Sequence, residues 1–308
     1  MLARFVLLAL LLELAAYAVV GAWLHSRGAD IPTLVAAAIA VALAARLAFV
    51  AATMSLGWLA ASEREPAHRG GWTCVPRLVL GEYRAVLANN FFYVPFDGLA
   101  APGERAPERT DRIPVILVHG YFGNRGFFGQ LLRSLDARGV APVFAPNLPG
   151  AFATIEQFAE ELHAAIERIA RATGQPKVIL VCHSMGGLAA RHYLARNGAN
   201  RVAKLITIAS PHAGTALAAL GLGSNARQMR RDSAFVTGLA RGEDGHAPCA
   251  TTSIYSPHDN LVSPQDTSRL AWARNIALPG LGHIAILSSP VTREVLLDEL
   301  REAGVRTA

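Results

Sequence analysis

The chain has 308 residues, of which 52% are hydrophobic, and its formal net charge is +6. This length fits one large α/β domain plus an extra segment. The hydrophobic excess lies in roughly the first sixty residues, which indicates membrane-embedded sequence joined to an ordinary globular remainder. A basic protein can bind nucleic acid, but no basic patch interleaved with aromatic residues is present in the sequence, so we expect no nucleic-acid partner.

Two long apolar runs open the chain, over residues 2–24 and 31–61, with a short polar break between them. At about 1.5 Å per residue in a helix, each is long enough to cross a bilayer core. Asp30 is placed as the N-cap of the second helix, and Pro32 lies in its first turn. We therefore predict a transmembrane helical hairpin over residues 1–62.

Glu13 and Arg46 interrupt these apolar runs, and ionisable groups in hydrocarbon are usually paired or face protein. Folding the hairpin back about its loop brings the two residues to similar depths, so we predict an ion pair between them. The alternative is that each side chain reaches the membrane surface separately or contacts another subunit.

The first run also permits a second interpretation, in which it is a signal peptide cleaved after residues 16–18 (Ala-Tyr-Ala). The length of the run and its acidic residue argue against cleavage, and the second run would still anchor the protein. Arg4 precedes the first run, Arg64 and Arg69 follow the second, and only Arg27 lies in the loop. The positive-inside rule therefore favours a cytoplasmic location for both ends.

Residues 63–112 are predicted to be a linker and lead-in segment. Residues 63–71 are polar, residues 72–111 are expected to contain an edge strand, and residues 101–110 have the composition of a surface loop. Three cysteines are too few for a disulfide framework. Cys74 and Cys249 would pair only in an oxidising compartment.

Residues 113–308 are predicted to form the catalytic domain, because strand-like and helix-like segments alternate along them. The expected strands cover residues 113–118, 141–145, 178–181, 202–209 and 251–255. The expected helices cover residues 126–138, 154–173, 188–196 and 291–302. Such alternation is typical of an α/β fold with a parallel sheet and helices on both faces.

Residues 178–187, reading VILVCHSMGG, are the most informative stretch. A buried strand ends abruptly at Ser184, and a helix begins at once, which is the context of a nucleophile elbow. The strained turn needs small residues two before and two after the serine, and these positions hold Cys182 and Gly186. Cysteine at the first position departs from the usual glycine. An ordinary glycine-rich turn is the alternative.

The first predicted strand of this domain ends in His119 and Gly120, and the ends of parallel strands face a common crevice. Acyl transfer needs two backbone N–H groups directed at the oxygen on which negative charge develops. We predict that Met185, the residue after the nucleophile, supplies one, and that Tyr121 supplies the other.

A serine nucleophile needs a histidine base oriented by a carboxylate, and in this fold the order along the chain is serine, acid, histidine. Asp259 follows the last predicted strand, and His283 lies in a tight loop before the final helix. We therefore predict Ser184, Asp259 and His283 as the catalytic residues. The weaker candidates are His119, His183, His212, His258 and Asp266.

Several short motifs together resemble one family. They are His119-Gly120, residues 182–187 (CHSMGG), residues 210–215 (SPHAGT), Tyr255-Ser256-x-x-Asp259 and Gly280-x-Gly282-His283. From about residue 113 to the end, the chain resembles the bacterial triacylglycerol lipases and esterases of the α/β-hydrolase superfamily, and the last two motifs are similar to the small Bacillus-type lipases. The resemblance implies an α/β-hydrolase fold, the same triad, and an oxyanion hole at Tyr121 and Met185. The amino-terminal hairpin departs from those secreted enzymes, and no calcium-site carboxylates are evident.

The sequence therefore predicts a membrane-anchored serine hydrolase that cleaves lipid or other acyl esters at the bacterial inner membrane, without a cofactor or metal. Residues 214–245 are expected to form either a small cap over the crevice or an ordinary packed helix pair. A thioesterase, a phospholipase or an acyltransferase acting through the same triad is an alternative function. A non-catalytic membrane scaffold with a hydrolase fold is another. Protein partners are not indicated by the sequence.

Overall fold

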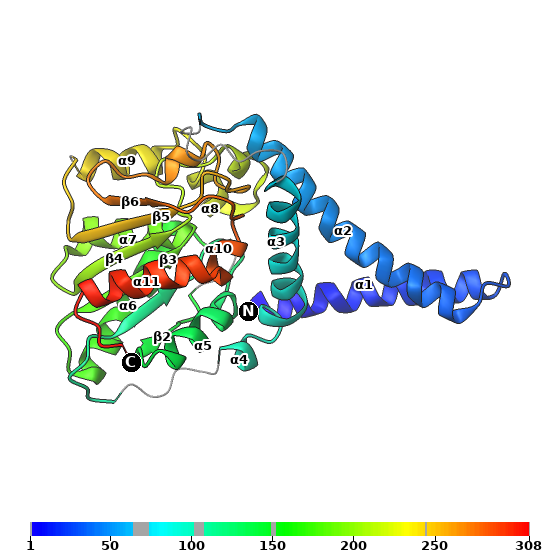
Figure 1. Cartoon of the computed structure of the whole chain (residues 1–308), viewed down its shortest axis with the longest axis horizontal. Coiled ribbons are helices and arrows are strands. Elements are labelled where there is room, and N and C mark those ends of the chain that lie inside the picture. The colour runs from blue at the N-terminus through cyan, green and yellow to red at the C-terminus, as the bar shows by residue number, and fades with distance from the viewer. Residues whose placement is uncertain (1, 64–73, 102–107, 149–151, 244, 308) are drawn as a thin grey trace.

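The computed structural model describes residues 2–63, 74–101, 108–148, 152–243 and 245–307. A hairpin of two long helices projects from an α/β body that contains one sheet (Figure 1). Most of the predicted polar linker at residues 63–71 and much of the predicted loop at residues 101–110 lie outside the described residues.

The sheet has six strands in the order β2-β1-β3-β4-β5-β6, and every neighbouring pair is parallel. The strands are β1 (Val115–Val118), β2 (Val143–Phe144), β3 (Val178–His183), β4 (Val202–Ile208), β5 (Ala250–Tyr255) and β6 (Arg274–Ala277). All four residues of β1 and all six of β3 are buried, which explains why these strands read as unbroken apolar runs. The predicted α/β class with a parallel sheet is confirmed.

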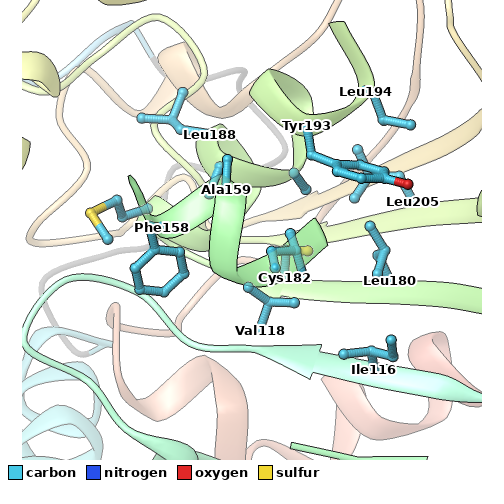
Figure 2. Packing of buried hydrophobic residues seen from close by; sticks show 14 of the residues in the cluster. Ile116, Val118, Phe158, Ala159, Leu180, Cys182, Leu188, Tyr193, Leu194 and Leu205 are labelled. Carbon is cyan, nitrogen blue, oxygen red and sulfur yellow. The ribbon is translucent and has the colours of Figure 1, made fainter. Parts of the chain in front are cut away.

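Helices cover both faces of the sheet. Ile116, Leu180 and Cys182 face α6 (Ile155–Thr173) and α7 (Met185–Asn197), and Figure 2 shows this packing around Phe158 and Tyr193. The alternate strand residues face a second cluster built from α5 (Gly129–Ala137), α10 (Ala285–Ser288) and α11 (Pro290–Glu302). Since successive strand side chains point to opposite faces, each central strand contributes to both cores.

The two ends of α6 are determined by residues in the local sequence. The side chain of Thr154 accepts a hydrogen bond from the Gln157 backbone, and the Gln157 side chain accepts one from the Thr154 backbone. This reciprocal capping box begins the helix, and Gly174 ends it in the left-handed region at a φ of 72°.

The lead-in segment differs from the prediction. Residues 75–100 form α3 (Val75–Ala88), a π-helical turn at Asn89–Tyr93 and α4 (Asp97–Ala100), so the expected edge strand is wrong. The apolar side of α3 packs through Leu78 and Val86 on the second hairpin helix, and this contact favours a helix over a strand. The two edges of the sheet are β2, which lies within the strand expected at residues 141–145, and β6, which was not predicted.

The hairpin consists of α1 (Leu2–His25) and α2 (Ile31–Leu59), joined by a short turn and splayed apart toward the body (Figure 1). Both helices are long and apolar enough to cross a membrane, by length and composition. Asp30 caps α2 by accepting a hydrogen bond from the Thr33 backbone at 2.9 Å, as predicted. The predicted pair is also confirmed, since Arg46 Nη2 donates to Glu13 Oε2 at 2.6 Å. The carboxyl-terminal part of α2, including Val50 and Met54, is buried against α3.

The segment predicted as a cap contains a 3₁₀ turn at Ala216–Leu220, α8 (Gly223–Gln228) and α9 (Ala234–Glu243). The 3₁₀ turn and α9 have different surroundings. Ala218 and Leu220 line the cavity described below, whereas Val236 and Leu239 of α9 are buried in the body. The segment therefore combines a cavity wall with ordinary helix packing.

Candidate active site

Ser184 lies in a strained turn between the end of β3 and the start of α7. Its φ of 55° is unusual for a residue with a side chain, and such strain is typical of functional turns. The turn is crowded by the neighbouring strand. A Cβ on Gly186 would lie 2.6 Å from the Val118 carbonyl oxygen, and one on Gly187 would lie 2.3 Å from Ser210 Oγ. Only glycine at these two positions lets the elbow approach the sheet so closely.

The structure brings Ser184, His283 and Asp259 together from three distant parts of the chain. His283 Nε2 lies 3.0 Å from Ser184 Oγ, and His283 Nδ1 lies 2.9 Å from Asp259 Oδ2. Asp259 Oδ1 also accepts hydrogen bonds from the backbones of Leu261 and Val262, both at 2.8 Å. All three residues of the triad are buried, and Ser184 is the most exposed at 9%. The arrangement is a hydroxyl, an imidazole and a buried carboxylate in series.

The backbone of His283 is held as firmly as its ring. Its N–H donates to Asn260 Oδ1 at 2.9 Å, and its carbonyl accepts from His183 Nε2 at 3.2 Å. The pKa of His183 is well below its usual range because burial disfavours the charged ring, so this neighbour acts as a neutral donor. Every polar group of His283 therefore has a partner that fixes its position.

Glu82 is a buried carboxyl that the sequence analysis missed. It lies on α3, is 0% exposed, and accepts hydrogen bonds from the backbones of Ile284 at 3.0 Å and Ala285 at 2.9 Å. A Cβ on Gly282 would lie 2.4 Å from a Glu82 oxygen, so glycine at this position makes room for the carboxyl. Burial raises the pKa of Glu82, and the two backbone donors oppose that rise. Glu82 thus fixes the loop that carries His283 through the two residues that follow the histidine.

The electrostatic surroundings of His283 favour its charged form overall. Burial lowers the pKa of the imidazole, but the charge and hydrogen bond of Asp259 and the charge of Glu82 raise it further than burial lowers it. The net result is a pKa above the ordinary value. An imidazole of this kind is suited to holding a proton during a reaction.

The two predicted oxyanion donors lie beside Ser184. Met185 begins α7, and the first N–H groups of a helix have no carbonyl of their own helix to bind. A Cβ on Gly120 would lie 2.8 Å from Ser184 Cβ and 3.1 Å from the Met185 nitrogen, so the turn before Tyr121 is in direct contact with the elbow. The Tyr121 hydroxyl donates to the Leu222 carbonyl at 2.8 Å, which directs that side chain toward the cavity wall.

The other candidates occupy structural positions. His119 Nε2 accepts a hydrogen bond from the Leu148 backbone, and burial lowers the pKa of His119 to about 4. His212 is buried against Thr207 and Arg191, and His258 accepts from the Gly280 backbone. Asp266 is exposed, and its backbone contacts Ser62 rather than any residue of the triad. Within the described ranges, no group of three or more His, Cys, Asp or Glu side chains is arranged to hold a metal ion.

Ser184 and His283 open into a cavity of about 530 Å³. Its lining is mainly apolar, and its largest contributions come from the turn after β1, from residues between 215 and 229, from one side of α2, and from α3 with the π-helical turn that follows it. An apolar cavity with a few convergent polar groups is the usual form of a small-molecule site.

Comparison with known proteins agrees with this fold. The family described as "alpha/beta hydrolase fold" matches residues 113–232. The lipase B structure from Aspergillus fumigatus superposes with a TM-score of 0.54 at 25% identity, covering 62% of this chain and 52% of that one. The chain therefore has the α/β-hydrolase fold. The mature lipase BlEst2 of Bacillus licheniformis has the same fold, with a TM-score of 0.53 at 18% identity over 65% of this chain and 96% of that one.

Among curated proteins, this chain is similar to a triacylglycerol lipase of Pseudarthrobacter phenanthrenivorans. The two are 38% identical over 116 residues, which cover 35% of this chain and 35% of the lipase. The chain therefore spans about a third of the length of the relative it matches.

Proposed function

We propose that this protein is a membrane-anchored serine hydrolase that cleaves carboxylic esters of lipids. The main support is the contact of three side chains at an apolar cavity: His283 Nε2 lies 3.0 Å from Ser184 Oγ, and His283 Nδ1 lies 2.9 Å from Asp259 Oδ2. Similarity to a triacylglycerol lipase supports a lipid ester as the substrate class.

The reaction has two halves. Ser184 Oγ attacks the ester carbonyl carbon while its proton passes to His283 Nε2, and the Met185 and Tyr121 N–H groups stabilise the oxyanion. The carbon–oxygen bond to the alcohol then breaks, and His283 gives its proton to the leaving alcohol. Water repeats the same steps on the acyl-enzyme and releases the acid. Asp259 keeps the proton of the neutral ring on Nδ1 and stabilises the imidazolium.

A fluorophosphonate probe tests the proposal directly. Purified protein in detergent is expected to form a covalent adduct at Ser184, and Ser184→Ala protein is expected to remain unlabelled. Turnover of p-nitrophenyl esters of several chain lengths, an acyl-CoA and a phospholipid then separates an esterase or lipase from a thioesterase or phospholipase. Protein that is folded but neither labelled nor active would support the scaffold alternative.

The hairpin supports anchoring, because α2 is both apolar enough to span a bilayer and packed on the body through its carboxyl-terminal end. The arginines at the two ends of the hairpin support a cytoplasmic location for the catalytic domain at the inner membrane. Protease added outside bacterial spheroplasts should therefore leave the domain intact, whereas cleavage from outside would reverse the orientation.

The pH dependence of hydrolysis follows from the proposed role of His283. The ring must be neutral to accept the serine proton, so kcat/KM falls as the pH falls through its pKa. Since the pKa of His283 is raised, the acid limb is expected above the ordinary imidazole value of about 6.5. A pH profile of kcat/KM for a water-soluble ester measures it, and a midpoint below that value would contradict the prediction.

Glu82→Gln is expected to move this limb to lower pH, because it removes a negative charge that raises the pKa of His283. The amide oxygen can still accept from Ala285, but the amide N–H₂ then faces the Ile284 N–H, at a cost of about 1–3 kcal/mol in unfolding free energy. A purely structural role would lower stability without moving the limb. Glu294→Gln, which removes an exposed carboxylate, is the matched control and should change neither quantity much.

A further inference from the structure

One face of α2 forms part of the wall of the active-site cavity. Phe49, Thr53 and Leu56 line the same cavity as Ser184 and His283. Their spacing of four and then three residues places them in one row along the helix. The helix predicted to span the membrane therefore extends beyond its span into the site.

The position of this row along α2 coincides with the expected membrane boundary. A span needs about 20 residues, or about 30 Å, so a span that starts at Ile31 leaves the hydrocarbon near Val50. Phe49 lies at that boundary, while Thr53 and Leu56 lie beyond it on the side of the catalytic domain. The row thus leads from the bilayer toward the triad.

The two apolar residues of the row are open to the outside as well as to the cavity, whereas Thr53 between them is buried. Phe49 is 53% exposed and Leu56 is 39% exposed. Leu220 and Leu222 also line the cavity and are 70% and 66% exposed. Large exposed apolar side chains gathered around a cavity indicate a lipid or protein contact, and here they continue the apolar surface of a membrane helix.

Polar contacts hold α2 in this place against the loop of Asp259. Asn260 Nδ2 donates to Thr53 Oγ1 at 2.9 Å, and Ser263 Oγ donates to the Gly57 carbonyl at 2.7 Å. A Cβ on Gly57 would lie 3.0 Å from the Asn260 carbonyl oxygen, so the helix and the loop are in close contact. The cavity wall is therefore fixed to the triad, and α2 does not act only as a tether.

We propose that the substrate is a long-chain acyl ester resident in the bilayer, which enters the site sideways along the Phe49, Thr53 and Leu56 face of α2. The entry is the part of the cavity that this face and residues 220–222 line together, and the acyl chain leaves the hydrocarbon without crossing water. This inference rests on the proposed esterase function and specifies where its substrate comes from.

The test narrows the entry with Leu56→Trp and compares two substrates in reconstituted full-length protein. One is a long-chain diacylglycerol embedded in phosphatidylcholine vesicles, and the other is water-soluble p-nitrophenyl acetate. The ratio of kcat/KM for the vesicle substrate to that for the acetate is expected to fall about tenfold in Leu56→Trp. Leu47→Trp is the matched control, since Leu47 is also on α2 and exposed but lies outside the cavity lining; its ratio should equal that of the wild type.

The outcomes separate the two proposals. An unchanged ratio in Leu56→Trp, or an equal fall in Leu47→Trp, overturns entry along α2. Wild-type protein that hydrolyses the acetate but not the vesicle substrate also overturns it, while leaving the esterase proposal intact. Wild-type protein that hydrolyses neither ester and resists the fluorophosphonate removes the proposed function itself.

Discussion

Ser184→Ala and His283→Ala are each expected to lower kcat for ester hydrolysis about 10⁶-fold, and the double variant is expected to lose no more. The two groups act as one unit, because the Ser184 hydroxyl attacks only as its proton passes to His283 Nε2, 3.0 Å away. Once either is absent, the other contributes nothing further. Binding and the oxyanion donors should still leave a residual rate roughly 10³–10⁴-fold above that in water.

Initial rates on a p-nitrophenyl ester, with the three variants and wild type at equal concentration, measure this non-additivity. Ser224→Ala is the control, since that hydroxyl accepts an exposed hydrogen bond from Arg227 and lies outside the cavity lining. If the fold decreases in kcat of the two single variants multiply in the double variant, Ser184 and His283 do not share a proton transfer.

The central strands and the positions of Ser184 and Asp259 after two of them were predictable because their signals are local. β1 and β3 are buried on both faces, so each reads as an unbroken apolar run. A strand that ends in a serine flanked by small residues indicates a nucleophile elbow. The small residue is needed because a side chain on Gly186 would collide with the Val118 carbonyl. Asp259 was found because it directly follows β5, where the carboxyl end of a parallel strand meets the site.

Glu82 and α3 were not predictable in the same way. The contacts of Glu82 with Ile284 and Ala285 join residues more than two hundred positions apart, and no local pattern marks a carboxylate that accepts from a distant backbone. The segment around α3 was expected to hold an edge strand, because its helical periodicity is meaningful only once α2 is known to lie against it.

The edge strand β6 was missed for a related reason. It includes Arg274 and Asn275, and its burial is partial, so it lacks the apolar run that identifies the central strands. Its place is determined by pairing with β5. An edge strand has one neighbour and one open side, and its sequence is correspondingly polar.

For the predicted oxyanion donors, the sequence establishes the position of the residues but not their role. The sequence places Tyr121 and Met185 at two strand ends, and the fold brings the Gly120 turn into contact with Ser184. Their proposed role depends on where a substrate oxygen lies relative to two backbone N–H groups. That geometry is defined by the bound ester, so kinetics rather than topology must test it.

Asp259→Asn is expected to lower kcat about 10⁴-fold while leaving the fold intact. The amide oxygen can still accept from the Leu261 and Val262 backbones, so the loop keeps its hydrogen bonds. The amide N–H₂ then faces His283 Nδ1 and donates to it, which moves the ring proton to Nε2. In that tautomer the ring cannot accept the proton of Ser184, and the imidazolium loses its counter-charge.

Asp266→Asn is the matched control for this variant. Asp266 is the rival acid in the sequence, but it is exposed, and its backbone contacts Ser62 rather than the triad. Its kcat should stay within about twofold of wild type, as expected for a surface change with little effect on stability. A large loss in Asp266→Asn with near-normal activity in Asp259→Asn would exchange their roles. A loss in Asp259→Asn that recovers at high pH, where the serine proton is more easily removed, would instead support the tautomer argument.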